Sequence, residues 1–456
     1  MGKCRRGVQS QWNWGGGGDE SQARVMNARH PHVLVDLNGW TAGHAMGALV
    51  YRPAPLVINY MGFAGSTGSE FVDFAAFDPI AAPPEHASSF SERLLFLPRS
   101  YFVTDFLRAD FSSVGEERAG GDGGKAAALR EARRAEGLDT DAVLLCNHDQ
   151  GYKIDPHRFS SWVHIGRRKV GAMLPQMWLL EQEDASTNAA LRMAAGMEVG
   201  DRIVFAPKVA VRAHVRRIRL CQLALDTATI GAHTTAANYL WARVPVVTLP
   251  GQHVMSRVAA SLLLALARDS HSTGGDSAGA AIAATIARTE DDYIAVARAL
   301  VRGARRAADE DGGGAGDGVN ARTGGGAGRR CSGGKRTDRA SGMYVHIRQC
   351  LCAATEPLDA FSAPRHTLGG ARSVLWDEGS SRSTSITPPD SVGNTASTAA
   401  SGPAVFDTGR WVRDWERALV LTVDLRLATS SSRQGDALRG AGGERGAGGF
   451  SIVVSS

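Results

Sequence analysis

The stretch LALDTATIGAHTTAANYLWARVPVVTLPG, residues 223–251, decides the fold of this chain. It is typical of a short buried strand, a loop, a helix that starts near His233, and a second buried strand from Val244. The helix start offers backbone N–H groups and the hydroxyls of Thr234 and Thr235 at the positive end of the helix dipole. Such a helix start after a strand favours a bound phosphate group, although Thr234 also fits a simple helix cap.

Strand and helix patterns alternate through the residues that precede this stretch. The apolar runs AVLLCNH, PQMWLLE and RIVFAP predict strands, and STNAALRMAAGME predicts a helix between the last two. A further helix is predicted to begin at Asp155-Pro156, with Asp155 as its cap. This alternation indicates βαβ units and a mostly parallel sheet, in which ligands bind beyond the carboxyl ends of the strands. The loops expected at that edge follow Asn147, Pro207, Thr227 and Pro250.

The rest of the chain divides by composition into patterned and low-complexity segments. HVLVDLNG (32–39) and LVINYMG (56–62) predict strands of a first lobe, and a linker that ends in a helix separates it from the second. Gly-rich and then Ser/Thr-rich residues predict a disordered insertion after Arg306, and VFDTGRWVRDWERAL predicts a helix that packs on the body. The expected segments are a disordered leader (1–24), a partial N-terminal catalytic lobe (25–112), a linker (113–140), a C-terminal nucleotide-binding lobe (141–306), the insertion (307–402), a C-terminal helix (403–422) and a tail (423–456).

Composition excludes several classes of protein. Lys and Arg total 51 against 46 Asp and Glu, and the basic residues are scattered, so a nucleic-acid-binding surface is not indicated. No apolar run reaches the roughly 18 residues of a membrane span, and the first residues lack the apolar core of a secretory signal. The six cysteines stand singly except Cys350 and Cys352, whose spacing fits neither a zinc site nor a redox pair. These features predict a soluble protein of a reducing compartment, cytoplasmic or nuclear.

Several segments, in collinear order, resemble the catalytic region of the protein O-GlcNAc transferase family, which includes the plant SECRET AGENT and SPINDLY types. They are HVLVDLNGWTAG (32–43), RPAPLVINYMGFAGSTG (52–68), CNHDQGYKIDP (146–156), AHVRR (213–217), LALDT (223–227) with HTTAANYLWARVPVVTLPG (233–251), SRVAAS (256–261) and VFDTGRWVRDWERAL (405–419). The resemblance implies an α/β fold of the GT-B type, with two Rossmann-like lobes. It also implies inverting, metal-independent transfer of N-acetylglucosamine from UDP-GlcNAc to Ser or Thr of intracellular proteins, without a cofactor.

The resemblance also implies roles for individual residues. Departure of UDP requires cations, N–H donors or a helix dipole at the diphosphate. Lys153 and Gln150 match the family's leaving-group contacts, although Lys153 also fits a solvated lysine beside a helix start. The residues expected to hold the donor are His214, at the uracil-stacking position, His233, Thr234, Thr235, Asn238, Val209 and Gly62. Gly62 would let backbone approach the sugar or diphosphate closely, or would form an ordinary turn.

The chain departs from the family pattern at several places. No match is found before His32 for the first strand and helix of the N-terminal lobe, which carry a catalytic-site His, or for the tetratricopeptide array. Asn238 stands where the family has an Asp on the ribose, and Val211 stands where a Lys is expected. Arg243 replaces a Gly, which costs about a kcal/mol or more if that turn requires a positive φ. These departures leave the general base unassigned.

Three other functions fit the same residues. The chain is also consistent with a catalytically inactive UDP-binding module that contacts partners through residues 307–402. It is consistent with the related plant-type protein O-fucosyltransferases that use GDP-fucose, although the YKIDP, AHVRR and HTT segments favour the O-GlcNAc branch. It also fits an incomplete fragment that folds poorly. UDP binding without turnover would indicate the first alternative, and competition by GDP rather than UDP the second.

Overall fold

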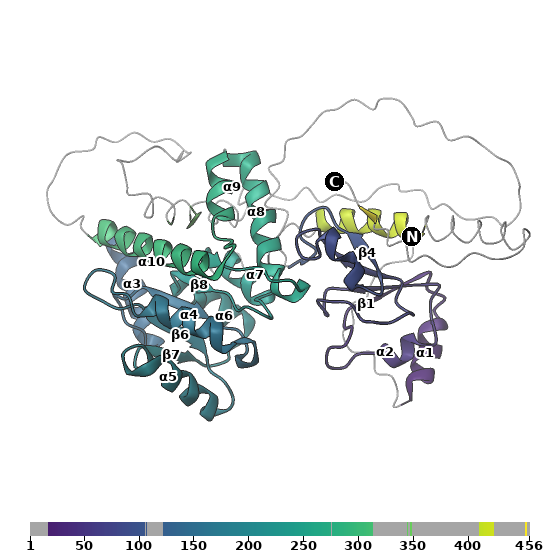
Figure 1. Cartoon of the computed structure of the whole chain (residues 1–456), viewed down its shortest axis with the longest axis horizontal. Helices are drawn as coiled ribbons and strands as arrows, with labels where there is room; N and C mark the ends of the chain where they lie inside the picture. Colours follow the sequence, from purple (N-terminus) through teal and green to yellow (C-terminus); the bar gives the residue numbers. More distant parts are fainter. Residues whose placement is uncertain are drawn as a thin grey trace, which may run out of the picture.

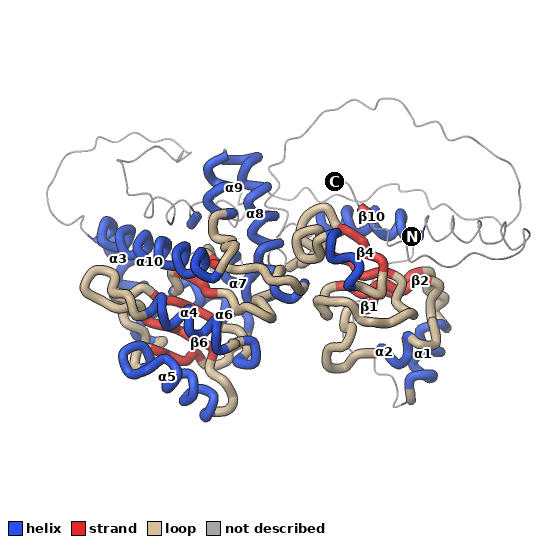
Figure 2. Tube along the Cα trace, in the orientation of Figure 1, coloured by secondary structure: helices blue, strands red, loops and turns tan. Residues whose placement is uncertain are grey.

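The computed structural model describes residues 17–104, 106, 122–274, 276–312, 344, 347–348, 410–423 and 452–453. These residues form two lobes, each built on a parallel five-stranded sheet (Figure 1). Figure 2 shows the strands of the C-terminal lobe enclosed by helices. The architecture is therefore α/β with two Rossmann-like lobes, as the sequence predicts. The start of the predicted linker lies outside the described residues. So does most of the predicted insertion and of the predicted tail.

The sheet of the C-terminal lobe has the strand order β7-β6-β5-β8-β9. Its strands are β5 (Leu144–Asn147), β6 (Gln176–Leu180), β7 (Ile203–Ala206), β8 (Leu223–Leu225) and β9 (Val246–Val247), and all pairs are parallel. The strands β6 and β7 lie in sequence on one side of β5, and β8 and β9 lie on the other side. The strand order therefore reverses between β5 and β8, which is where open α/β sheets bind their ligands.

Helices connect these strands at the positions that the sequence predicts. They are α4 (Pro156–Gly166), α5 (Ala185–Gly200), α6 (Val211–Arg217) and α7 (Thr234–Trp241), with the short 3₁₀ turns η3 (Gly151–Lys153), η4 (Ile218–Leu220) and η5 (Val254–Ser256) between them. Asp155 caps α4, because its carboxylate accepts a hydrogen bond from the N–H of Arg158 at 2.9 Å. The linker ends in α3 (Asp122–Ala135), as predicted.

Three further helices complete the C-terminal lobe: α8 (Val258–Gly274), α9 (Asp276–Ala283) and α10 (Glu290–Gly312). The predicted start of the insertion at residue 307 is wrong, because α10 continues to Gly312. An ion pair between Arg305 and Asp309, at 3.0 Å and one helical turn apart, stabilises this continuation.

The sheet of the N-terminal lobe has the order β1-β2-β3-β4-β10, again all parallel. Its elements are α1 (Asp19–Asn27), β1 (Val33–Asp36), α2 (Met46–Leu49), β2 (Leu56–Tyr60), β3 (Phe74–Phe77), η1 (Pro84–Ser89), β4 (Arg93–Phe96) and β10 (Ile452–Val453). The predicted disordered leader is wrong for residues 19–24, which lie in α1. Ala23 is buried, and Met26 packs on Met46 and Leu49 of α2, so apolar contacts order this helix.

A helix at residues 410–423 packs on the N-terminal lobe beside β4 (Figure 1, yellow). The rings of Trp411 and Trp415 stack at 5.6 Å, and the Tyr60 ring of β2 lies 4.6 Å from Trp415. Ala418, on the same face, is fully buried. The prediction of a helix that packs on the body is confirmed for residues 410–423, and the predicted residues 403–409 lie outside the described part.

Cys146 and Cys221 form a disulfide, with their Cα atoms 6.1 Å apart. The cysteines do stand singly in the sequence, and their spacing did not predict this bond. They are 75 residues apart in the sequence, but Cys146 lies in β5 and Cys221 directly precedes the neighbouring strand β8. Pairing of those two strands brings the thiols together, and sequence spacing does not reveal it.

Two side chains at the start of α8 join the lobes. The Ser261 hydroxyl lies 2.7 Å from the carboxylate of Asp78 and 2.8 Å from the Ser100 hydroxyl. The Arg257 guanidinium donates to the carbonyl of Ile80 at 2.8 Å. Asp78, Ile80 and Ser100 follow the strands β3 and β4 of the N-terminal lobe, so the loops at the carboxyl edge of that sheet contact the C-terminal lobe.

Candidate active site

Two loops meet at the point where the strand order of the C-terminal lobe reverses. One follows β5 and carries residues 148–153; the other follows β8 and carries residues 226–233. The Asn147 side chain ties them, because its amide donates to the carbonyl of Leu225 at 2.8 Å. The predicted phosphate-binding helix α7 begins directly after the second loop. The fold therefore places both predicted donor segments at one edge of the sheet.

A buried carboxylate, Asp149, lies at the centre of this edge. Its Oδ1 atom accepts from the Lys153 ammonium at 3.2 Å and from the Thr235 hydroxyl at 3.0 Å. Lys153 also donates to the carbonyl of Gly231 at 3.1 Å, and its side chain is only 12% exposed. Lys153 is therefore not the solvated lysine that the sequence leaves open. Sequence reasoning did not single out Asp149, although its place directly after a strand, in CNHD, was an available signal.

The first turn of α7 is open to a ligand. His233 occupies the N-cap position with φ −103° and ψ −90°, and no side chain caps the helix. The simpler reading of Thr234 as a helix cap is therefore wrong: it is the first helical residue, and it is exposed. Among the described residues, the N–H groups of residues 234–236 have no backbone partner, and the first intrahelical bond runs from Ala237 to the His233 carbonyl. Free N–H groups at a helix start attract anions.

Asp226 fixes the loop that leads into α7. Its carboxylate accepts from the Thr248 hydroxyl at 2.6 Å and from the N–H of Ala232 at 2.7 Å. The Tyr293 hydroxyl donates to the Asp226 carbonyl at 3.1 Å. Burial raises the pKa of the Asp226 carboxyl to about 7, and the two hydrogen bonds limit the increase. Asp226 therefore positions the residues before α7.

Three histidines at this edge favour the neutral imidazole. Burial and the nearby Arg217 lower the pKa of His214 to about 4. Burial, His214 and Arg217 hold the pKa of His148 well below its usual value, and His148 pairs with the Tyr239 hydroxyl at 2.8 Å. Burial also lowers the pKa of His233, whose ring nitrogen lies 2.9 Å from the carbonyl of Met255. The His214 ring, 5.4 Å from His148, is thus a flat, uncharged surface near pH 7.

The other predicted donor residues differ in burial and in their contacts. Gln150 precedes η3, is half-buried, and has no side-chain hydrogen bond within the described part of the chain. Asn238 is buried in α7, and its Oδ1 atom has no partner there either. Val209 is 42% exposed between β7 and α6. Gly62 belongs to the other lobe, and a Cβ atom there would overlap the carbonyl oxygen of Leu37, so contact between two loops already requires this glycine.

The structure describes two of the positions at which the chain departs from the family pattern, Arg243 and Val211. Arg243 has a φ of +65°, so the turn after α7 does require the left-handed conformation that glycine adopts freely. The prediction of local strain at this residue is confirmed. Val211 is the first residue of α6 and is exposed, so no cation stands at that position.

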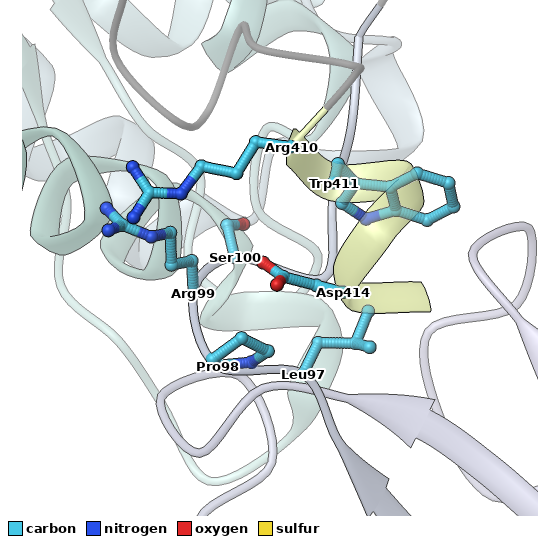
Figure 3. A pocket seen from close by; sticks show the side chains of 7 residues that line it. All are labelled: Leu97, Pro98, Arg99, Ser100, Arg410, Trp411 and Asp414. Atoms are coloured by element: carbon cyan, nitrogen blue, oxygen red, sulfur yellow. The ribbon is translucent and has the colours of Figure 1, made fainter. Parts of the chain in front are cut away.

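The N-terminal lobe reaches this site through Phe102, whose ring lies 6.2 Å from the His233 ring. Nearby, Figure 3 shows a small pocket between the loop after β4 and the helix at 410–423, with the Asp414 carboxylate beside Ser100. Its volume of about 10 Å³ is that of roughly one water molecule, so it does not hold a sugar nucleotide.

Among the described residues, no three His, Cys, Asp or Glu side chains lie together as a possible metal site. None of the helices in that part of the chain is both long enough and apolar enough to cross a membrane.

Residues 18–118 and 109–309 match glycosyl transferase family 41, which is more than half of the chain. The chain belongs to this family. The resemblance seen in the sequence is therefore confirmed, and the two loops at the edge of the C-terminal sheet lie within the residues that match the family.

Relatives of this chain carry names from one enzyme class. The probable UDP-N-acetylglucosamine–peptide N-acetylglucosaminyltransferase SEC of Arabidopsis thaliana is 32% identical over 244 residues, which are 53% of this chain and 24% of that protein. The corresponding transferase of Caenorhabditis elegans is 23% identical, with 58% of this chain and 30% of that protein covered. The chain thus spans under a third of the length of these relatives.

A solved structure shares the fold. An O-GlcNAc transferase mutant of Thermobaculum terrenum superposes with a TM-score of 0.51 and 21% identity, covering 74% of this chain and 52% of that one. This likeness supports the two-lobed GT-B architecture. It shows the fold alone.

Proposed function

We propose that this chain transfers N-acetylglucosamine from UDP-GlcNAc to Ser or Thr hydroxyls of proteins, with inversion and without a metal ion. The observation that carries the proposal is the convergence of Lys153 and Thr235 on one point, beside the free N–H groups of α7. These groups supply positive charge where a departing diphosphate accumulates negative charge. The named relatives act on peptides with a UDP-GlcNAc donor, and we extend that chemistry to this chain.

In the proposed reaction, the oxygen of an acceptor hydroxyl attacks the anomeric carbon of the donor and forms the new glycosidic bond. The bond from that carbon to the diphosphate oxygen breaks, and UDP leaves with the electron pair. The hydroxyl proton is released to solvent. Lys153, Thr234 and Thr235 would bind the phosphate oxygens, and the neutral His214 ring would stack on the uracil. Gln150 would contact the leaving group, while Asn238, Val209 and Gly62 would line the rest of the donor site.

The acceptors are part of the same proposal. We propose proteins as acceptors, because the relatives are named for transfer to peptides. The cytoplasmic or nuclear setting stays a prediction from the sequence, and the Cys146–Cys221 disulfide does not favour it, since disulfides are rare in reducing compartments. Neither a nucleic acid nor a membrane is part of the proposed reaction.

A second function has an observation in its favour. Asp149 places a carboxylate 3.2 Å from the ammonium that would neutralise the diphosphate. Before the phosphate binds Lys153, this pair must separate or accommodate a second negative group, and like charges at close range repel. This favours a chain that binds UDP weakly and transfers sugar slowly or not at all, as a UDP-binding module.

The test is transfer of radiolabelled sugar from UDP-GlcNAc to a Ser/Thr-rich peptide, together with UDP binding by calorimetry on the same preparation. We expect transfer by the wild-type chain and a loss of about 100- to 1,000-fold in Lys153→Ala, the range for removing one stabilising group at a developing charge. Arg268→Ala is the matched control, because Arg268 is an exposed cation of α8 with no proposed role in ligand binding. Its activity should remain within about twofold of wild type.

Each outcome decides between the two functions. Transfer that disappears in Lys153→Ala and persists in Arg268→Ala supports the transferase. UDP binding without any transfer supports the UDP-binding module. If GDP, rather than UDP, binds and competes with the donor, the donor assignment is wrong.

A further inference from the structure

A second recess lies in the C-terminal lobe, away from the donor site. Its volume is about 240 Å³, and its floor is formed by Ile165, Val170 and Val301. The helix α4 begins just after Lys153, at the carboxyl edge of β5, and runs back along the sheet. In a βαβ unit the end of that helix lies at the opposite edge, so this recess and the donor site are at opposite ends of α4. Figure 1 shows α10 beside α4.

Four cationic side chains line the rim of this recess, which we call the α4–α10 recess: Arg168, Lys169, Arg298 and Arg302. Within the described residues, Arg168, Lys169 and Arg302 make no ion pair. Arg298 donates to the carbonyl of His164 at 3.0 Å, and its Nε atom is buried without a partner. By contrast, Arg305, further along α10, pairs with Asp309. Within the described residues, the cations of the recess thus lack the carboxylate partner that Arg305 has.

The nearby cations lower the pKa of two groups at this recess. Burial, with Arg168 and Arg302, lowers the pKa of Arg298. His164, at the same place, has its pKa lowered by burial and by the cations Arg298, Arg168 and Arg167. The carbonyl end of α4 offsets part of the charge on the arginines that follow it. It does not offset Arg298 and Arg302, which lie mid-helix and one turn apart, where like charges repel.

We infer that the α4–α10 recess is a second ligand site, which binds a small phosphate-bearing anion through Arg168, Lys169, Arg298 and Arg302. Phosphate oxygens accept charge-assisted hydrogen bonds from several cations at once, and arginine matches their geometry. The apolar floor would receive the uncharged part of the molecule. The volume lies below the roughly 300–1,000 Å³ of sites for drug-sized ligands, which indicates a small molecule.

The test uses the wild-type chain and inorganic pyrophosphate as the probe, with hydrogen–deuterium exchange as a local readout. We expect slower exchange in peptides that cover residues 164–171 and 298–303, because a bound anion restrains both segments. In the double variant Arg168→Gln and Arg302→Gln, the pyrophosphate concentration needed for half of the protection should rise about tenfold, since two charge-assisted contacts are lost. Both residues are exposed, so neither glutamine disturbs the core.

The matched control is Arg268→Gln with Arg413→Gln, two exposed arginines elsewhere in the chain. It removes the same net charge and should leave the protection unchanged. The proposal is overturned if pyrophosphate protects neither segment in the wild type. It is also overturned if both double variants lose protection equally, because the effect would then be general attraction to a basic protein. Protection confined to residues 147–153 would report the donor site alone and would likewise contradict a second site.

Discussion

The two lobes share a parallel sheet but differ in strand order, and this difference separates their roles. In the C-terminal lobe the order reverses between β5 and β8, and open α/β sheets bind their ligands at such a reversal. In the N-terminal lobe the described strands β1 to β4 follow one another across the sheet without reversal. Its loops pack on each other, as at Gly62 and Leu37, or on the other lobe. Donor binding is therefore expected to depend on the C-terminal lobe.

The buried carboxylates of the lobes differ in the same way. Asp78 accepts four hydrogen bonds: from the N–H groups of Ile80, Ala81 and Tyr101 and from the Ser261 hydroxyl. Asp149 accepts from the Asn147 amide at 3.4 Å and from Lys153 and Thr235, and a phosphate could take over the last two groups. Asp78 is thus a fixed joint between the lobes, and Asp149 holds groups that are expected to exchange partners. The following substitutions test this contrast.

Asp78→Asn should have the largest effect on stability. Both carboxylate oxygens of Asp78 accept two donors, so an amide NH₂ at one position leaves two donors unsatisfied. We expect the free energy of unfolding to fall by roughly 2–6 kcal/mol, measured by urea denaturation. Asp226→Asn is the control, because its amide can donate to the Thr248 hydroxyl and accept from Ala232. Equal stability of the two variants would contradict the role of Asp78 as a joint.

Asp226→Asn should change the pH dependence of stability. The folded-state pKa is raised to about 7, whereas an unfolded Asp titrates near about 3.9, so folding favours the protonated form. The contribution of Asp226 is therefore fully present below about pH 4 and is lost as the pH rises through 7. Relative to the Asn variant, the wild type should lose about 4 kcal/mol of unfolding free energy across that window. Urea denaturation of both proteins over this pH range measures the difference, and parallel curves would refute it.

Asp149→Asn should strengthen UDP binding. The substitution removes a negative charge beside the proposed diphosphate site and frees Lys153, while an amide oxygen can still accept from Thr235. We expect the dissociation constant for UDP to fall about tenfold, or about 1.4 kcal/mol, by calorimetry. A weaker complex would mean that Asp149 positions Lys153 for the phosphate rather than competing with it.

Arg243→Gly should have the smallest effect. Relief of the positive φ at Arg243 is expected to add about 1 kcal/mol to the free energy of unfolding, seen as a higher melting temperature. The N-terminal lobe offers the comparison. Arg52 also has a positive φ, and its guanidinium pairs with Asp73 at 2.9 Å, so the loss of this ion pair should offset the backbone relief in Arg52→Gly. A gain of about 1 kcal/mol in Arg52→Gly would show that the ion pair contributes nothing.

Much of the fold is predictable from the sequence, because most of the predicted strands are buried on both faces and appear as continuous apolar runs. This holds for β1, β2 and β5 to β9, and for α4 with its Asp155-Pro156 start. The strands β3 and β4, with the sequences FAAF and RLLF, were not predicted. The two residues of β10 give no periodic signal, and α1 depends on contacts with α2 that a local pattern does not reveal.

The candidate site was predictable where a single segment carries its signal. The open start of α7 follows from the HTT run, and the positive φ of Arg243 follows from its turn. The contacts that the sequence did not reveal form only when strands distant in the sequence lie side by side. The Asp149 contact with Thr235, the Asp226 contact with Thr248 and the Cys146–Cys221 disulfide all require the pairing of β5, β8 and β9, which no local sequence pattern encodes.

The most direct measurement is a crystal structure of the chain with UDP bound. We expect the β-phosphate within hydrogen-bond distance of the Lys153 ammonium and of the N–H groups at the start of α7, with the Lys153–Asp149 contact lengthened from 3.2 Å. We also expect the uracil against the His214 ring. UDP bound away from the edge between β5 and β8, or with its phosphates held by the N-terminal lobe, would contradict the assignment of donor binding to the C-terminal lobe.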